Sequence, residues 1–243
     1  MLVPRPIWGS IPSANPPDLA GTTTASYYAT TSAPSTNLLS TICQTQGQRA
    51  FIGRTNMDTD LQPAYYQDSS PAFAVDATKS TISHVEQIDP KNSLVKPIIT
   101  PRFAPSCSKE LLAGLGELSK ESRLPVQTHI SENKDEVALV KKLFPEQDSY
   151  AAVYDHFNLL TERTVLAHAI HLSPDEIQLV KQRKAKISHC PVSNSSLSSG
   201  LCPVRKYLDE GIEVGLGTDM SGAYPHLHSH LPTYFPNAAS NTN

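Results

Sequence analysis

Short apolar segments alternate with stretches of helical periodicity through most of the chain, and this alternation limits the fold more than any other feature. Seven segments predict β-strands, because each is short, apolar and rich in β-prone residues: 22–28, 49–55, 95–101, 125–130, 164–170, 185–190 and 212–218. Strands that alternate with helices in this way build parallel sheets. The sequence therefore predicts an α/β fold.

The helices between the later segments carry clear boundary signals. Ser173 is followed directly by Pro174, and Glu176 lies three positions after the serine. This pattern combines an N-cap, a first-turn proline and a capping box. It predicts a helix that begins at residue 174 and supports the assignment of alternating strands and helices.

Composition divides the chain into three parts. Residues 1–20 and 225–243 are rich in proline and lack hydrophobic periodicity, which predicts irregular segments. Residues 21–224 hold the regular alternation and predict a single domain of β/α units. The chain has 243 residues, which is close to the usual length of a (β/α) barrel.

Charge and cysteine content argue against several classes of function. The chain has 20 basic and 23 acidic residues, a net charge of −3, which gives no electrostatic basis for binding nucleic acid or an anionic membrane. The four cysteines show no Cys-x-x-Cys spacing, so neither a disulfide scaffold nor a thiolate zinc site is predicted. No segment has the apolar length of a membrane span or a signal sequence. We therefore expect reduced thiols and a cytoplasmic location.

Side chains that can bind metal or move protons fall at the C-terminal ends of the later predicted strands. In a closed barrel these ends meet at one mouth, whereas an open doubly wound sheet would spread them along a line. Convergence on one site therefore favours the barrel. The side chains are His129, Glu132, His168, His189 and Asp219.

Each of these side chains also has a structural interpretation. A single histidine near a strand end is more often a satisfied core residue than a ligand, and Asp219 could cap the helix that follows it. The repetition of such residues at four strand ends shifts the balance toward a shared site. Imidazole and carboxylate together are ligands that suit zinc.

Several longer motifs carry a family resemblance. In order and approximate spacing they resemble guanine deaminases, which are metal-dependent barrels of the amidohydrolase superfamily. The resemblance covers about residues 20–224 and implies a TIM-like (β/α)8 barrel, a zinc ion, and hydrolysis of guanine to xanthine and ammonia. The motifs are GTTTASYYAT, GQRAFIGRTNMD, VKPIITPRF, VQTHISEN, TVLAHAIHLS, ISHCPVSNSSLSSG and VGLGTDMSGAY.

The resemblance also implies roles at the metal. His129 and Asp219 would be zinc ligands, and Asp219 would help to orient the attacking hydroxide. Glu132 would take a proton from the zinc-bound water and deliver it to the ring and to the leaving ammonia. His168 would lie beside that water as a third catalytic residue, without being a principal ligand.

A second set of roles concerns the substrate. Arg102 would donate hydrogen bonds to the purine carbonyl, and Phe103 would stack on the ring. His129 and Glu132 would also contact the substrate from the metal side. His189 is interpreted as structural.

The sequence departs from the family pattern in one respect that bears on the metal. Family members begin the barrel with a strand that ends in His-x-His and binds the metal, and no such pair precedes His129. The resemblance therefore predicts about seven of the eight strands, weakened zinc binding, and two open sheet edges that invite pairing. The segment PHLHSHL offers His226, His228 and His230 as alternative ligands.

Three interpretations of function follow. The first is a guanine deaminase, with a possible homodimer as its assembly. The second is a catalytically inactive, truncated form that acts by association with a full-length subunit. The third is a related amidohydrolase that acts on another purine or on a pterin.

Overall fold

The structure is a computed structural model that describes residues 23–219. Residues Thr24–Asp219 form one compact unit. The predicted irregular segments 1–20 and 225–243 lie outside the described residues, and so do the three histidines of PHLHSHL. Within the described residues, no helix combines the length and the apolar character that a membrane crossing requires.

Every paired strand in the described part of the chain runs parallel to its neighbour. All seven predicted strands are present, and two of them are each divided in two by a short irregular stretch. The strands are β1 (Thr24–Tyr28), β2 (Arg49–Gly53), β3 (Thr55–Asn56), β4 (Val95–Pro97), β5 (Thr100–Pro101), β6 (Val126–Ile130), β7 (Thr164–His168), β8 (Lys186–His189) and β9 (Val214–Leu216).

The order of the strands in space follows their order in the chain. The sheets run β1-β2-β4, β3-β5 and β6-β7-β8-β9. A bridge between Ile99 and Val126 joins the line of β4 and β5 to β6, where the Gln127 amide donates to the Ile99 carbonyl at 2.9 Å. Parallel neighbours in chain order are typical of a (β/α) barrel, whereas an open doubly wound sheet reverses its order at a switch point. The barrel prediction is therefore confirmed for the seven predicted strands, which form β1 to β9 in the structure.

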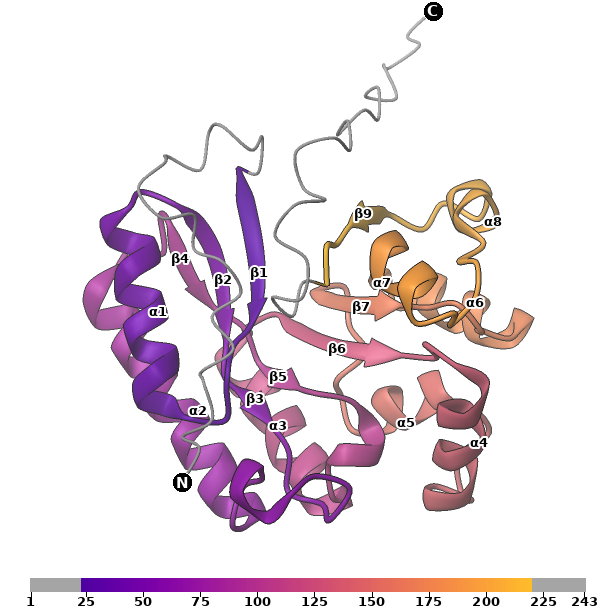
Figure 1. Cartoon of the computed structure of the whole chain (residues 1–243), viewed down its shortest axis with the longest axis horizontal. Coiled ribbons are helices and arrows are strands. Elements are labelled where there is room, and N and C mark those ends of the chain that lie inside the picture. The colour runs from indigo at the N-terminus through magenta and orange to yellow at the C-terminus, as the bar shows by residue number, and fades with distance from the viewer. Residues whose placement is uncertain (1–22, 220–243) are drawn as a thin grey trace, which may run out of the picture. The chain divides into compact units, whose positions relative to one another are not determined.

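Helices follow most of the strands and pack against them. Figure 1 shows α1 and α2 alongside β1, β2 and β4, and α1 and α2 also pack against each other. The helices are α1 (Ala33–Thr45), α2 (Pro71–Ile88), α3 (Lys109–Ser122), α4 (Lys134–Leu143), α5 (Tyr150–His156), α6 (Pro174–Gln182), α7 (Pro191–Ser196) and α8 (Val204–Asp209), with short 3-10 turns at Ala64–Tyr66 and Ala104–Ser106.

The start of α6 confirms the predicted capping box. Ser173 accepts a hydrogen bond from the Glu176 amide at 3.3 Å, and the Glu176 carboxylate accepts one from the Ser173 amide at 2.8 Å. The other carboxylate oxygen of Glu176 accepts from the Ala151 amide at the start of α5. This side chain therefore caps α6 and also ties it to the preceding helix.

Most buried apolar side chains belong to a core that extends from α2 and α3 across β6, β7 and β8 to α8. A smaller cluster lies between α1, α2, β2 and β4 and includes Ile52, Val85 and Val95. These cores hold the strands at fixed spacing. The C-terminal strand ends are thereby set close together at one end of the sheet.

Candidate metal and catalytic site

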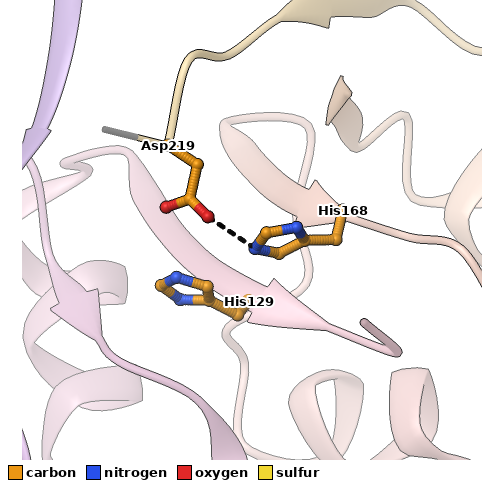
Figure 2. Close-up of side chains that lie close together, drawn as sticks. All are labelled: His129, His168 and Asp219. Carbon is orange, nitrogen blue, oxygen red and sulfur yellow. Dashed lines mark ion pairs between the residues drawn. The ribbon is translucent and has the colours of Figure 1, made fainter. Parts of the chain in front are cut away.

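Three side chains at or near the ends of β6, β7 and β9 form the centre of the candidate site, and we refer to His129, His168 and Asp219 as the three-residue group. One possible ligand atom from each lies within 4.8 Å of the others. Figure 2 shows the two imidazole rings side by side, with the Asp219 carboxylate close to both. His129 lies on β6, His168 ends β7 and Asp219 follows β9. The parallel strands bring them together because their C-terminal ends share one edge.

The His129 ring is held by the backbone of the neighbouring strand. Its Nδ1 lies 2.7 Å from the carbonyl oxygen of Arg102, which can only accept, so Nδ1 carries the hydrogen and the Nε2 lone pair is free. Burial and the neighbouring His168 lower the pKa of His129 to about 4. The ring is therefore neutral at pH 7, which is the form that binds a metal.

His168 is the most deeply buried member of the group, at 1% exposure. Its Nδ1 lies 2.9 Å from Oδ1 of Asn194, and its ring stacks on that of His129 with centroids 5.3 Å apart. Its Nε2 has no hydrogen-bond partner among the described residues. A buried polar atom without a partner is costly, so this nitrogen marks a place for an ion, a water molecule or a ligand.

Glu132 lies beside the three-residue group without belonging to it. One carboxylate oxygen is 3.8 Å from Nε2 of His168, and the other accepts a hydrogen bond from the Ser199 hydroxyl at 3.3 Å. Asp219 lies at the same distance from Nε2 of His168, 3.8 Å. A carboxylate in this position can exchange protons with a molecule bound at the group.

The backbone is strained at the strand ends that carry these side chains. Ser131, His168, Ala169 and Asp219 all have positive φ angles, of 49°, 69°, 49° and 48°. The left-handed conformation costs a non-glycine residue roughly 1–2 kcal/mol. Such residues cluster at active sites and ligand clamps, and here they border one group of polar side chains.

Arg102 and Phe103 lie next to the group, directly after β5. The Arg102 carbonyl accepts from the His129 amide at 3.0 Å as well as from its ring. The guanidinium lies over the Phe103 ring at 5.2 Å, and its nearest polar contact is the sulfur of Met57 at 3.9 Å. No carboxylate within residues 23–219 pairs with it, so its N–H groups are available to a ligand.

Three residues at the site were not singled out from the sequence. Gln127 is 1% exposed and donates to the Tyr27 carbonyl at 2.9 Å and to the Thr100 hydroxyl at 3.0 Å. The Tyr28 ring meets His129 edge-on at 4.6 Å, and its buried hydroxyl has no partner among the described residues.

The third is Asn194. It lies in the segment ISHCPVSNSSLSSG, but its contact with His168 spans 26 residues and no local sequence pattern predicts it. His189, interpreted as structural, lies outside the three-residue group. Burial and His168 lower its pKa.

Comparisons with known proteins support the fold and the family. The sequence profile of the amidohydrolase family matches residues 19–239. The chain is 56% identical over 204 residues to a probable guanine deaminase of Schizosaccharomyces pombe, covering 84% of this chain and 38% of that protein. It is 46% identical over 208 residues to the human guanine deaminase, covering 85% of this chain and 45% of that protein.

A solved structure agrees with these relatives. The guanine deaminase of C. acetobutylicum, crystallised with guanine in its active site, superimposes with a TM-score of 0.80 at 45% identity. The match covers 84% of this chain and 48% of that protein. The chain thus spans half the length or less of the relatives that it matches.

Proposed function

The chain belongs to the amidohydrolase family, and on that basis we propose that it holds a zinc ion and hydrolyses guanine to xanthine and ammonia. The observation that carries the proposal is the three-residue group with Glu132 beside it. The guanine deaminases among its relatives, one of them with guanine in the active site, indicate the substrate.

The donor atoms of the group fit a zinc ion. We assign His129 and Asp219 as ligands, with the Nε2 lone pair of His129 turned away from Arg102. Neutral imidazole and carboxylate are common zinc ligands, and a catalytic site keeps one position open. When bound, zinc supplies the Lewis acidity that makes water a nucleophile at neutral pH.

The protein's own side chains would manage the protons. Glu132 takes a proton from the attacking water as the water oxygen bonds to the guanine carbon that bears the amine. It delivers that proton to the ring nitrogen, then takes the second proton from the hydroxyl now on the carbon and passes it to the amine, and the C–N bond breaks to release ammonia as the carbonyl forms. Nε2 of His168 lies 3.8 Å from both the Glu132 and the Asp219 carboxylates, and His168 and Asp219 would orient the water for Glu132.

The substrate would be held by the residues after β5. The guanidinium of Arg102 has N–H groups available for the purine carbonyl, and Phe103 offers an aromatic face for the ring. A planar, hydrogen-bonding substrate is the type of ligand that this pair suits.

The proposal is tested with the purified chain loaded with zinc. Ammonia release is measured with guanine, adenine and a 2-aminopterin as separate substrates. Release from guanine alone is the expected result. Release from the pterin or from adenine would instead identify a related amidohydrolase, and no release from any of the three would overturn the proposed activity.

One observation favours a second candidate function, which is association with another subunit. Within residues 23–219, β1 pairs only with β2 and β9 pairs only with β8, so each has an edge without a strand partner. Unpaired strand edges are places where another chain can add. Co-purification with a full-length guanine deaminase, combined with no ammonia release, would favour this candidate.

Zinc content tests the assigned ligands before any substrate is added. We expect about one zinc per chain. The His129→Ala variant should lose most of it, because the substitution removes the neutral imidazole that is assigned as a ligand beside Asp219. Elemental mass spectrometry of dialysed protein gives the ratio. The control is His156→Ala, which changes an exposed histidine at the end of α5 and should leave the zinc content unchanged. Equal zinc content in both variants would contradict the assignment of His129.

A further inference from the structure

We propose that Asn194 is a positioning residue that keeps the hydrogen of the His168 ring on Nδ1, so that the Nε2 lone pair faces the space beside the three-residue group. The inference rests on the proposed function only for the use of that lone pair, which would accept a hydrogen bond from the attacking water. The tautomer itself can be observed without substrate.

The contact between the two side chains carries the inference. Oδ1 of Asn194 lies 2.9 Å from Nδ1 of His168, within ordinary hydrogen-bond distance. An amide oxygen can only accept, so Nδ1 must be the donor. A neutral imidazole carries one ring hydrogen, and Nε2 is then left with a bare lone pair.

The other side of the ring offers the alternative tautomer no hydrogen bond. The carboxylates of Glu132 and Asp219 are each 3.8 Å from Nε2, which is beyond hydrogen-bond reach. Nε2 has no partner among the described residues, whereas Nδ1 has a short contact. The preference for hydrogen on Nδ1 is therefore set by Asn194.

Asn194 is held firmly enough to impose this choice. It lies in α7, which begins with Pro191 directly after the end of β8, and it is 3% exposed. The backbone N–H of Asn194 donates to the Cys190 carbonyl at 3.0 Å, and its backbone carbonyl accepts from the Ser199 N–H at 2.9 Å. Its side-chain Nδ2 has no partner in the described part of the chain, so His168 is the contact that orients the amide group.

The pairing of β7 with β8 explains how Asn194, which follows β8, reaches His168 at the end of β7. β7 and β8 pair in parallel, with Ala167 opposite Ser188. The turn after β8 therefore emerges beside the end of β7, and α7 carries Asn194 back over His168. Partners that orient an imidazole in this way fix its tautomer and ring position.

The test is nuclear magnetic resonance of the full chain labelled with ¹⁵N at histidine. Long-range proton–nitrogen correlations distinguish a protonated from a bare ring nitrogen, and His168→Gln identifies the signals of His168. At about pH 8, above the ordinary imidazole pKa of about 6.5, the expected wild-type spectrum shows hydrogen on Nδ1 and a bare Nε2. The spectrum is recorded both without metal and after addition of zinc.

Two substitutions of Asn194 make the test specific. Asn194→Leu has a similar shape and no acceptor, and it should lose the Nδ1–H form as the major species. Asn194→Asp keeps an acceptor and should retain that form. If the leucine variant does not fold, Asn194→Ala takes its place. A wild-type spectrum with hydrogen on Nε2 would overturn the inference, as would an unchanged tautomer in the variant without an acceptor.

The outcome is independent of the proposed activity. A chain that releases no ammonia and still shows Asn194-dependent hydrogen on Nδ1 would refute the deaminase proposal and leave this inference standing. An active chain with the opposite tautomer would do the reverse.

Discussion

Replacement of Glu132 by glutamine is expected to lower guanine-dependent ammonia release by at least about a hundredfold, because the attacking water and the leaving amine would both lose their proton carrier. Glutamine keeps the size of the side chain and the contact with Ser199, whose hydroxyl donates to Oε1 at 3.3 Å. The variant therefore removes proton transfer with little change in packing. The rate is measured with saturating guanine and zinc-loaded protein.

Two controls give this result its meaning. Zinc content should be unchanged in Glu132→Gln, because the carboxylate lies beside the three-residue group and is not assigned as a ligand. Glu121→Gln changes an exposed carboxylate near the end of α3 and should keep the wild-type rate. A Glu132→Gln variant with full activity would assign the proton transfer to another group, and one without zinc would make Glu132 a ligand.

The architecture was largely predictable from local sequence patterns. Each of the seven predicted strands lies where short apolar runs stand between helical stretches, and the capping box at Ser173 marks the start of α6. The irregular stretches that divide two of the strands were not predicted. One of them lies at Arg54, whose guanidinium turns to pair with Asp68 in the buried interior. Such a break follows from a tertiary contact and leaves no local signal.

The site was predictable to a smaller degree. Histidines and a carboxylate at the ends of the later strands, combined with the parallel topology, predict that His129, His168 and Asp219 lie together, as they do in the structure. The supporting residues could not be found in this way. Asn194 and Tyr28 act through contacts with histidines on other strands, and those contacts depend on side-chain directions that only the folded chain defines.

Gly116 is a position where a single added methyl group is expected to have a large effect on stability. It is buried in α3, and a Cβ atom there would lie 1.8 Å from the carbonyl oxygen of Phe157 and 2.9 Å from its carbonyl carbon. Both are backbone atoms, so no rotation of a side chain can relieve the overlap. Alanine gains about 1 kcal/mol over glycine in helix propensity, but overpacking of this kind costs roughly 1–3 kcal/mol or more. Because the overlap is with fixed backbone atoms, we take the upper end of that cost and expect Gly116→Ala to lower the free energy of unfolding by about 2 kcal/mol net.

Gly114→Ala is the matched control, because it makes the same change in the same helix. Its Cβ would meet only Cγ2 of the Val75 side chain, at 2.9 Å. That side chain is partly exposed and can move, so the helix-propensity gain should roughly cancel the strain. Urea unfolding of both variants, followed by circular dichroism, gives the comparison. Equal stability of the two variants would mean that the α3–α5 contact yields more easily than the structure implies.

Gly116→Ala should also affect the candidate metal site, because the displaced backbone at Phe157 directly follows α5. The Tyr154 hydroxyl in α5 donates to the carbonyl of His129 at 2.8 Å and accepts from the Ala104 amide and the Thr128 hydroxyl, each at 2.9 Å. A shift of Phe157 would displace the end of α5 and weaken the contact of Tyr154 with β6, the strand that carries His129. Gly116→Ala is therefore expected to lose zinc at urea concentrations at which Gly114→Ala retains it. Zinc retention that is equal in the two variants, despite unequal stability, would show that the site is held by the sheet alone.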